Sequence, residues 1–581
     1  MEFMQFRPGE SGYETELAGF DRIVSHRPAA VAAVRSAAEV RAAVRYAAER
    51  GMPVAVQSTG HGPAAAVGGD SLLLSVRRLR GVHVDPAART ARVAAGTRWQ
   101  EVVDAAAPHG LAPLCGSSPL VGVVGYTLGG GLGPLARTYG YAADQVTAVS
   151  LVTADGRLRE VTAEREPELF WALRGGGKSG FGVVTALTFR LPPVARLYGG
   201  GLRFAGADAA AVLGAWRRVT RAAPEALTTS LALLRVPGGG GLAVHVRVAV
   251  AAERGREPEQ GLEPLGEELV RPLREAAPAV ADTVRIRPYR TVAEIHEDPV
   301  DPMPYHERNI LLREFDAAAE AALLASAGPG AECADWAVEL RHLGGAAGRA
   351  PAVPSAVGSR AAAFTLTTLT SPDADSGVRT ALAPWSTGGR YVNFLAGPGT
   401  ERLTAEAYDA ETYARLRAVK RTYDPENVFR HGHAVPPAAT GAERTAPSGN
   451  PAPGVAVPPA AAEPGGPVPA GSPDGGRDEK AGPAGAAGSP VAGAAPPAAA
   501  EAAGPPPPDG SPPPDDPLSP DGPARRESAG AAPPAAGGPP PPGSAEDGGS
   551  APPGAAGPGA GAAARPSAPA DTAARPYRRV S

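Results

Sequence analysis

The first 190 residues alternate between helical and strand-like spacing of their apolar side chains. Residues 30–51 place Ala and Val at helical spacing, which predicts a helix that ends at Gly51. Thr97 is expected to cap another helix. Short apolar runs bounded by turn residues predict strands over 53–56, 71–76, 81–94 with a turn at 85–86, 146–152 with a hairpin at 155–156, and 183–191. The mixture favours an α/β arrangement without a regular βαβ series.

From about Pro192 the pattern changes to alternation with a period of two, which is typical of antiparallel strands. A helical stretch over 209–223 lies among the alternating stretches, which cover 227–236, 241–250, 336–343 and 361–370. This predicts a second region, an antiparallel sheet flanked by helices. Residues 391–430 are expected to form a strand, a loop and a capped helix, so the fold class expected for the whole is α+β.

Composition changes at about Pro436, where Pro, Gly, Ala and Ser become dominant. Alanine supplies most of the apolar content beyond this point, and it buries too little area to offset the entropy of ordering the chain. Residues 438–581 are therefore predicted to be a disordered tail.

Charge and cysteine content exclude several classes of function. The 581 residues carry a net charge of −4, which gives no argument for a nucleic acid or a membrane as partner. Cys115 and Cys333 are the two cysteines, too few for a disulfide framework or a cysteine-rich zinc site. His431 and His433 lack a third ligand nearby, so no metal is predicted. With no signal peptide or membrane span in the sequence, a cytoplasmic protein is expected.

His61 stands between Gly60 and Gly62, directly after the strand-like run 53–56. A histidine in this position lies on a tight loop at the end of a strand, where backbone can approach a ligand closely. Taken alone, the stretch favours a turn histidine without chemistry. Two further glycine-rich loops, at 121–146 and 172–185, suit the binding of a pyrophosphate through exposed backbone N–H groups.

The third loop also satisfies a relaxed P-loop pattern, Ala172-x4-Gly177-Lys178-Ser179. A true P-loop follows a strand and opens a helix, whereas here a helical stretch comes first and a strand follows. If the chain were nevertheless a nucleoside triphosphatase, mutation of Lys178 would be expected to abolish nucleotide binding.

The order and spacing of five motifs over residues ~7–435 resemble the FAD-binding PCMH-type flavoproteins of the vanillyl-alcohol oxidase superfamily, and more closely the berberine-bridge-enzyme-like oxidases. The stretches are SHRPAAVAAV, PVAVQSTGHG, LVGVVGYTLGGGLGPLARTYG, ELFWALRGGGKSGFGVVT, and YVNF with LRAVKRTYDPENVF. The resemblance implies an FAD-binding domain over 22–194, to which 390–437 return, and a substrate-binding domain over 195–389.

The resemblance also implies which residues bind FAD. His61 matches the histidine that is joined covalently to the flavin 8α-methyl carbon. The other residues expected to contact the cofactor are Ser58, Thr59, Gly60, Gly62, Ser118, Gly122, Gly125, Gly129, Gly130, Gly131, Gly133, Asp144, Gly182, Val184, Asn393 and Asn427.

The chain departs from the family at two positions. Relatives with a second covalent link use a cysteine where this chain has Ser118, which cannot form a thioether, so attachment through His61 alone is expected. The tyrosine that often acts as the base is replaced by Phe394, which cannot accept a proton. Tyr391 and Glu339 are the candidates for this catalytic role.

The activity implied is oxidation of an alcohol, hemiacetal, amine or activated C–H of a small molecule, such as a sugar or a secondary-metabolite intermediate. Hydride passes to flavin N5, and O2 is the expected acceptor. Two alternatives stay open at this point. One is a flavin-binding protein with degenerate catalysis, and the other is a dehydrogenase that uses another acceptor.

Overall fold

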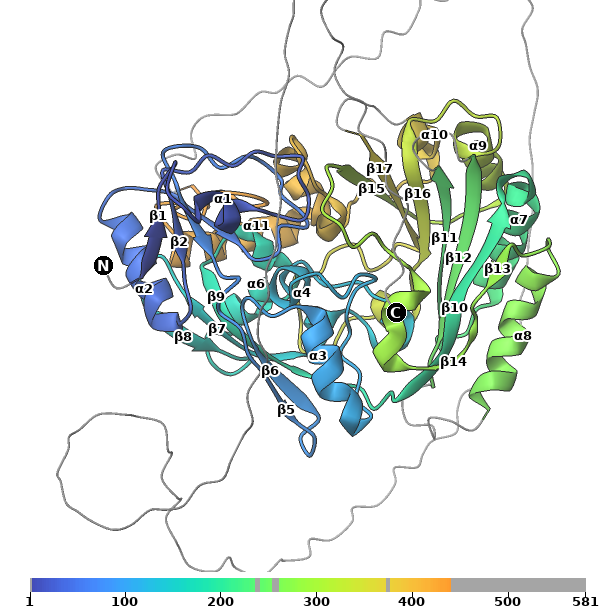
Figure 1. Ribbon diagram of the computed structural model, residues 1–581, viewed down its shortest axis with the longest axis horizontal. Coiled ribbons are helices and arrows are strands. Elements are labelled where there is room, and N and C mark those ends of the chain that lie inside the picture. The colour runs from blue at the N-terminus through green and yellow to red at the C-terminus, as the bar shows by residue number, and fades with distance from the viewer. Residues whose placement is uncertain (1–2, 236–240, 253–260, 372–376, 440–581) are drawn as a thin grey trace, which may run out of the picture. The chain divides into compact units, whose positions relative to one another are not determined.

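The computed structural model describes residues 3–235, 241–252, 261–371 and 377–439. The predicted disordered tail, 438–581, lies almost entirely outside these residues. Within the described residues the chain mixes helices and three sheets, so the α+β prediction is confirmed (Figure 1). The helices are α1 (Tyr13–Leu17), α2 (Ala37–Ala48), α3 (Trp99–Ala106), α4 (Val123–Leu128), α5 (Ala136–Tyr139), α6 (Pro167–Gly176), α7 (Ala209–Ala222), α8 (Leu262–Arg274), α9 (Ala317–Ala327), α10 (Gly377–Ala381) and α11 (Ala410–Tyr423).

Two sheets form within the first 190 residues. The first has four strands in the order β1-β2-β4-β3: β1 (Met4–Phe6), β2 (Ala30–Ala33), β3 (Val54–Gln57) and β4 (Leu72–Ser75). The second has five antiparallel strands in the order β5-β6-β9-β7-β8: β5 (Val82–Asp85), β6 (Thr90–Ala94), β7 (Val146–Val152), β8 (Leu158–Val161) and β9 (Val183–Arg190). The predicted strands and the predicted hairpin are thereby confirmed.

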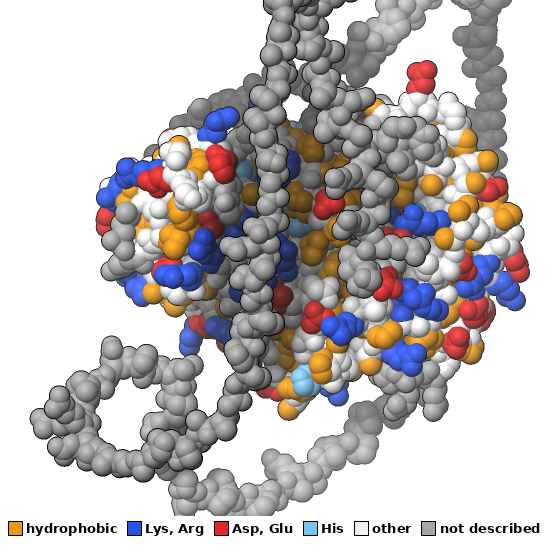
Figure 2. Space-filling view, viewed as in Figure 1, with side chains coloured by type: hydrophobic (Ala, Val, Ile, Leu, Met, Phe, Trp, Pro, Cys, Tyr) orange, Lys and Arg blue, Asp and Glu red, His pale blue; other side chains and the backbone are white. Residues whose placement is uncertain are grey.

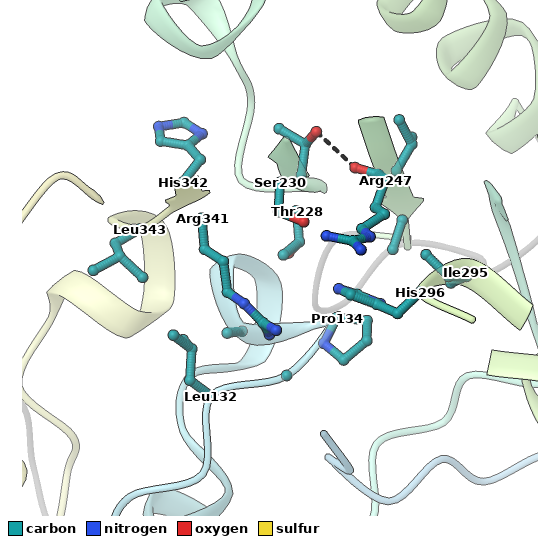
Figure 3. Close-up of a pocket in the computed structure, with 15 residues that line it drawn as sticks. Leu132, Pro134, Thr228, Ser230, Arg247, Ile295, His296, Arg341, His342 and Leu343 are labelled. Atoms are coloured by element: carbon teal, nitrogen blue, oxygen red, sulfur yellow. Dashed lines mark hydrogen bonds between the residues drawn. The ribbon is translucent and has the colours of Figure 1, made fainter. Parts of the chain in front are cut away.

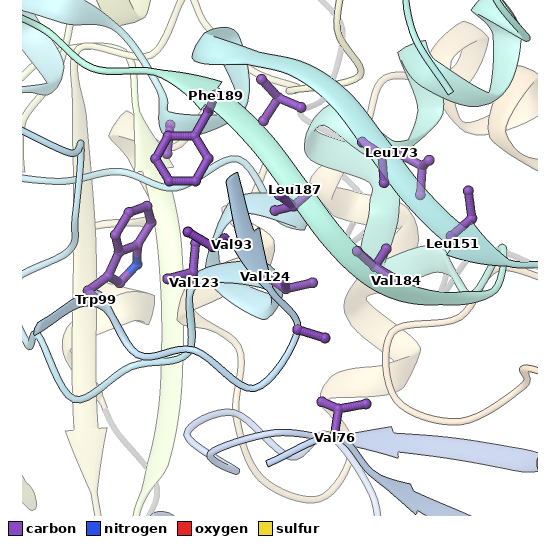
Figure 4. Close-up of a cluster of buried hydrophobic side chains, with 14 of the residues drawn as sticks. Val76, Val93, Trp99, Val123, Val124, Leu151, Leu173, Val184, Leu187 and Phe189 are labelled. Carbon is purple, nitrogen blue, oxygen red and sulfur yellow. The ribbon is translucent and has the colours of Figure 1, made fainter. Parts of the chain in front are cut away.

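One hydrophobic core joins these two sheets to the helices between them. Figure 4 shows its side chains, among them Trp99 of α3, Val123 of α4, Leu173 of α6 and Phe189 of β9. Leu416 of α11 belongs to the same core, so the C-terminal helix packs on the N-terminal part of the chain.

The third sheet has eight strands, all in antiparallel pairs. Its order is β13-β10-β12-β11-β16-β17-β15, with β14 also paired to β10. The strands are β10 (Arg196–Ala205), β11 (Leu227–Arg235), β12 (Leu242–Val250), β13 (Ala281–Asp282), β14 (Arg285–Pro288), β15 (His306–Leu312), β16 (Asp335–His342) and β17 (Phe364–Thr370). The antiparallel strands predicted from alternation are confirmed.

Helices α7, α8 and α9 cover one face of this sheet (Figure 1). Alternate residues such as Leu231, Leu233, Val338 and Leu340 point into that core. The other face therefore carries the residues in between, and many of them are polar; we call it the polar face. It is formed by Ser230, His245, Arg247, Glu307, Asn309, Glu339, Arg341, Thr365 and Thr367.

Three local predictions were wrong. Residues 30–51 form β2 and then α2, because 30–33 pair in parallel with β4 and Ser36 caps the helix by accepting from Glu39 N at 3.2 Å. The cap of α3 is Arg98, since the Thr97 hydroxyl donates to Gly81 O instead. Residues 392–394 form a 3-10 turn and not a strand.

Figure 2 shows basic and acidic side chains side by side over the part of the chain that carries α7 and α8. Among the described residues no helix combines the length and the apolar character that crossing a bilayer requires.

Candidate active site

His61 lies on the loop that follows β3. Gly60 has a φ of 66°, and a side chain there would place its Cβ 2.5 Å from Gly19 Cα. The Asp21 amide donates to Gly60 O, and the Phe20 amide donates to Thr59 O, each at 2.9 Å. This close backbone contact requires glycine at position 60 and fixes the histidine after it.

Several contacts orient the His61 ring. Its Nδ1 lies 2.9 Å from Thr59 Oγ1, and its ring stacks on Phe20 at 4.2 Å between centroids. The Tyr305 hydroxyl donates to the His61 carbonyl at 2.6 Å. Burial, and then the charge of Arg98, lower the pKa of His61 to about 4, so the imidazole is neutral at pH 7. A neutral imidazole keeps the lone pair that a nucleophile needs.

The second glycine loop lies against residues 391–393. A Cβ on Gly129 would stand 2.0 Å from Asn393 Oδ1, and one on Gly130 would stand 3.2 Å from the Tyr391 hydroxyl oxygen. Asn393 Nδ2 donates to Tyr126 O at 2.8 Å. Glycines in this loop thus allow the C-terminal segment to approach the backbone closely.

Four of the predicted cofactor residues carry a buried polar side-chain atom that has no hydrogen-bond partner among the described residues. The atoms are Ser58 Oγ, His61 Nε2, Asn393 Oδ1 and Asn427 Oδ1. Buried polar atoms are normally paired, because leaving one unpaired costs about 1–3 kcal/mol. The unpaired atoms of Ser58, His61 and Asn393 lie on or against the glycine loops, which fits a polar ligand such as FAD.

The other predicted cofactor residues differ in their surroundings. Gly62 and Gly125 face open space, since a Cβ on either would meet nothing within 4 Å. Gly122 N donates to Thr59 Oγ1 at 3.2 Å, which ties the first two loops together. Ser118 is half-buried.

Four predicted positions are engaged in contacts within the protein. Cβ atoms on Gly131, Gly133 and Gly182 would meet Tyr126 at 2.6 Å, Cys115 O at 1.9 Å and Val152 O at 2.5 Å, respectively. Val184 pairs with Leu151 in the second sheet. Their contact with a cofactor stays a prediction.

Asp144 forms a buried ion pair. Its Oδ1 accepts from Arg360 Nη2 at 2.6 Å, and its Oδ2 accepts from Tyr141 N at 3.1 Å. The pair joins the N-terminal part of the chain to residue 360 of the predicted substrate domain. Its contact with a cofactor also stays a prediction.

Tyr391, a candidate proton acceptor, is held rigidly. Asn309 accepts from Tyr391 N at 2.8 Å and donates to the carbonyls of Tyr391 and Phe394 at 2.9 Å each. Asn393 Nδ2 lies 3.3 Å from the Tyr391 hydroxyl, which accepts from it. Burial raises the pKa of Tyr391 well above its ordinary value, so the phenol stays protonated.

Glu339, the second candidate, lies between two arginines. Its Oε1 accepts from Arg247 Nη1 and Ser230 Oγ, and its Oε2 accepts from Arg341 Nε, each at 2.8 Å. Burial alone would raise the pKa of Glu339, but Arg341 and Arg247 outweigh it and lower the pKa. A carboxylate with both oxygens bonded to cations is a weak base, so this geometry gives little support to a proton-accepting role.

Two charged residues near the site were not among the predicted catalytic or cofactor residues. Burial raises the pKa of Glu307 to about 8, although Arg341 and Lys178 act in the opposite direction. Burial lowers the pKa of Lys178 to about 8, and Glu307 opposes this shift. The Lys178 Cε lies 3.1 Å from where a Gly129 Cβ would stand. The period of two along β15 that places Asn309 on the polar face also places Glu307 there, and this pattern is the signal by which the sequence could have identified Glu307.

A small cavity of about 20 Å³, room for one or two water-sized groups, lies between the second glycine loop and the polar face. Figure 3 shows the polar ends of Arg247, Arg341 and His296 turned toward one space beside Pro134. Arg341, which lines the cavity, also lies over the Phe394 ring at 4.9 Å and so connects the cavity lining to the 391–394 segment.

Residues 172–179 do not form a P-loop. They lie at the end of α6 and in the turn that follows it, and β9 comes next. This is the reverse of the strand-to-helix order in which a helix N-terminus binds phosphate, as the sequence predicted.

Comparison with known proteins adds independent evidence. Residues 28–162 match the family described as an FAD binding domain, and residues 390–436 match the family described as berberine and berberine like. The (R)-6-hydroxynicotine oxidase of Paenarthrobacter nicotinovorans is 29% identical over 457 residues, 74% of this chain and 96% of the relative. The xylooligosaccharide oxidase of Thermothelomyces thermophilus is 34% identical over 188 residues, 31% of this chain and 38% of the relative.

Solved structures show the same fold. The crystal structure of 6-hydroxy-D-nicotine oxidase from Arthrobacter nicotinovorans aligns with a TM-score of 0.65 and 26% identity, covering 75% of this chain and 98% of that one. A chitooligosaccharide oxidase aligns with a TM-score of 0.63 at 19% identity, covering 75% of this chain and 98% of its own.

Proposed function

Because the chain belongs to the berberine-bridge-enzyme-like FAD-linked oxidoreductases, we propose that it is an oxidase with FAD attached covalently through His61 alone. Its substrate is a small molecule with an oxidisable alcohol, hemiacetal, amine or activated C–H group, and O2 is the acceptor. The observation that carries the proposal is the neutral His61 ring, whose Nε2 is buried without a partner among the described residues beside the glycine cradle.

Each loop has its own part in holding the cofactor. Backbone N–H groups of residues 58–62 would hold the pyrophosphate, and the Gly129–Gly131 turn and Asn393 would hold the flavin part of the cofactor. When bound, FAD supplies an acceptor for the hydride that leaves the substrate carbon. Cys115 does not replace the missing second link, because its buried Sγ bonds to the Tyr289 hydroxyl at 3.3 Å and burial raises the pKa of the thiol to about 11.

We assign the proton-accepting role that Phe394 cannot perform to Glu307. Glu307 is half-buried on the polar face, and its carboxyl group interacts electrostatically with Arg341 and Lys178, both of which border the proposed site. Its pKa of about 8 is near the range in which a carboxylate is an effective base at neutral pH. In this assignment the neutral hydroxyl group of Tyr391 orients the substrate, and Glu339 positions Arg247 and Arg341.

An anaerobic titration tests the proposed activity. The purified protein is mixed without oxygen with oligosaccharides, with cyclic amines and with carboxylated members of both classes, and the flavin absorbance is followed. Bleaching by one of these, followed by recovery and peroxide release on admission of air, is the expected result. Bleaching without peroxide would contradict the oxidase assignment, and flavin that no substrate bleaches would contradict catalysis.

A further inference from the structure

The polar face carries more positive than negative charge at the cavity. Arg247 of β12 and Arg341 of β16 both line it, and Glu339 is the carboxylate bonded to them. Asp298 and Glu307 act on Arg341 electrostatically, but neither forms an ion pair with it among the described residues. Lys178 interacts electrostatically with Glu307 and does not belong to the cavity lining.

Glu339 leaves hydrogen-bond donors of both arginines unused. It bonds to Nη1 of Arg247 and to Nε of Arg341. The Nε of Arg247 is buried without a partner, and no hydrogen bond within the described residues uses the terminal amino groups of Arg341. A buried guanidinium donor without a partner, such as Arg247 Nε, is costly unless a ligand completes its bonding, and the terminal amino groups of Arg341 are available to the same ligand.

His296 supplies a further unused group on the same side. It is 7% exposed, and its Nδ1 is buried without a partner among the described residues. Figure 3 shows its ring facing the ends of Arg247 and Arg341 across the cavity. Two guanidinium groups and a neutral imidazole that converge on one space are a donor set suited to a carboxylate, which accepts paired N–H bonds in one plane.

We propose that the substrate carries a carboxylate, bound in this cavity by Arg341 and Arg247 while the oxidisable carbon lies toward Tyr391. This inference rests on the proposed function, since the cavity serves as a substrate site only if the protein is a flavin oxidase. It narrows the substrate class to acids: sugar acids, amino acids or carboxylated metabolites.

The test is titration of the FAD-loaded protein with benzoate, benzamide and inorganic phosphate, followed by the flavin visible spectrum. Benzoate is expected to perturb the spectrum with a saturable dissociation constant, and the neutral isostere benzamide is expected to bind at least about tenfold more weakly. Tighter binding of phosphate than of benzoate, or equal binding of benzamide, would overturn the proposal.

Variants assign the effect to the arginines. Arg341→Met is expected to weaken benzoate binding by about tenfold or more, and Arg341→Lys by less, since it retains the charge but loses the planar fork. Glu339→Gln is expected to tighten binding, because it removes the competing carboxylate. Arg217→Met, which removes a half-buried arginine paired with Glu320 beneath the opposite face, is the matched control and should bind as the parent does.

Misfolding and failure of the proposed function are separable from failure of this inference. If Arg341→Met does not fold, the Arg341→Met/Glu339→Gln double variant removes both charges together and should still weaken binding. Absence of FAD from the parent protein would contradict the proposed function. A different outcome would contradict only the carboxylate inference. In that outcome the protein contains FAD, neutral substrates bleach it, and kcat/KM is the same for the parent and Arg341→Met.

Discussion

His61 Nδ1 lies 2.9 Å from Thr59 Oγ1, and the same hydroxyl oxygen accepts from Gly122 N at 3.2 Å. One threonine therefore orients the proposed attachment residue and ties its loop to the second glycine loop. Thr59→Val keeps the shape of the side chain but leaves the Gly122 N–H without this partner. We expect a loss of about 1–3 kcal/mol in the free energy of unfolding and a larger share of FAD released by acid. Thr59→Ser, which retains the hydroxyl, should behave as the parent in both measurements.

Gly129 and Gly125 form a matched pair for testing the close approach of Asn393. A Cβ on Gly129 would overlap Asn393 Oδ1 at 2.0 Å, whereas one on Gly125 would meet nothing within 4 Å. Gly129→Ala should lower the free energy of unfolding by about 1–3 kcal/mol, and Gly125→Ala should leave it unchanged or raise it slightly. Thermal unfolding without added cofactor measures both. Equal stability of the two variants would mean that Asn393 does not pack on Gly129.

The Asp144–Arg360 pair should contribute strongly to stability. The two side chains are 7% and 13% exposed, and Oδ1 of Asp144 lies 2.6 Å from Nη2 of Arg360. Asp144→Asn leaves the guanidinium without its counter-charge, which costs about 3–5 kcal/mol for a buried pair. The exposed pair of Glu168 and Arg415 is the control, and Glu168→Gln should cost less than about 1 kcal/mol in the same denaturant titration.

The proposed base makes the rate depend on pH. Glu307 accepts a proton only when it is ionised, and burial raises its pKa to about 8. The rate of flavin reduction should therefore rise with pH through about 8 and level off above it. Glu307→Gln should lower the rate by about 10²–10⁴ and abolish this limb of the profile. Tyr391→Phe should keep the limb, because the phenol does not ionise in that range; its loss would assign the proton transfer to Tyr391.

The sequence predicts those parts of the fold that have a strong local pattern. Alternation of apolar and polar residues was sufficient for β11, β12, β16 and β17, because one face of these strands packs on helices and the other is polar. Helical spacing, by contrast, gave a wrong prediction at residues 30–33, where Ala and Val suit a helix and a buried strand equally. Pairing with β4, distant in the sequence, decides the outcome there.

The candidate site shows the same limit. The glycine loops and His61 could be placed from motifs, because each motif is contiguous in the sequence. The surroundings of Glu339 could not, since Arg247 and Ser230 reach it from other strands of the sheet. Glu307 carries no motif, and its raised pKa arises only from burial in the assembled structure.

The most direct test of the central claim is acid precipitation of the parent protein, His61→Ala and Ser118→Ala, followed by measurement of flavin absorbance in pellet and supernatant. We predict flavin in the pellet for the parent and for Ser118→Ala, and flavin only in the supernatant, or none, for His61→Ala. Flavin that is released into the supernatant from the parent, or that stays in the pellet of His61→Ala, would contradict covalent attachment through His61.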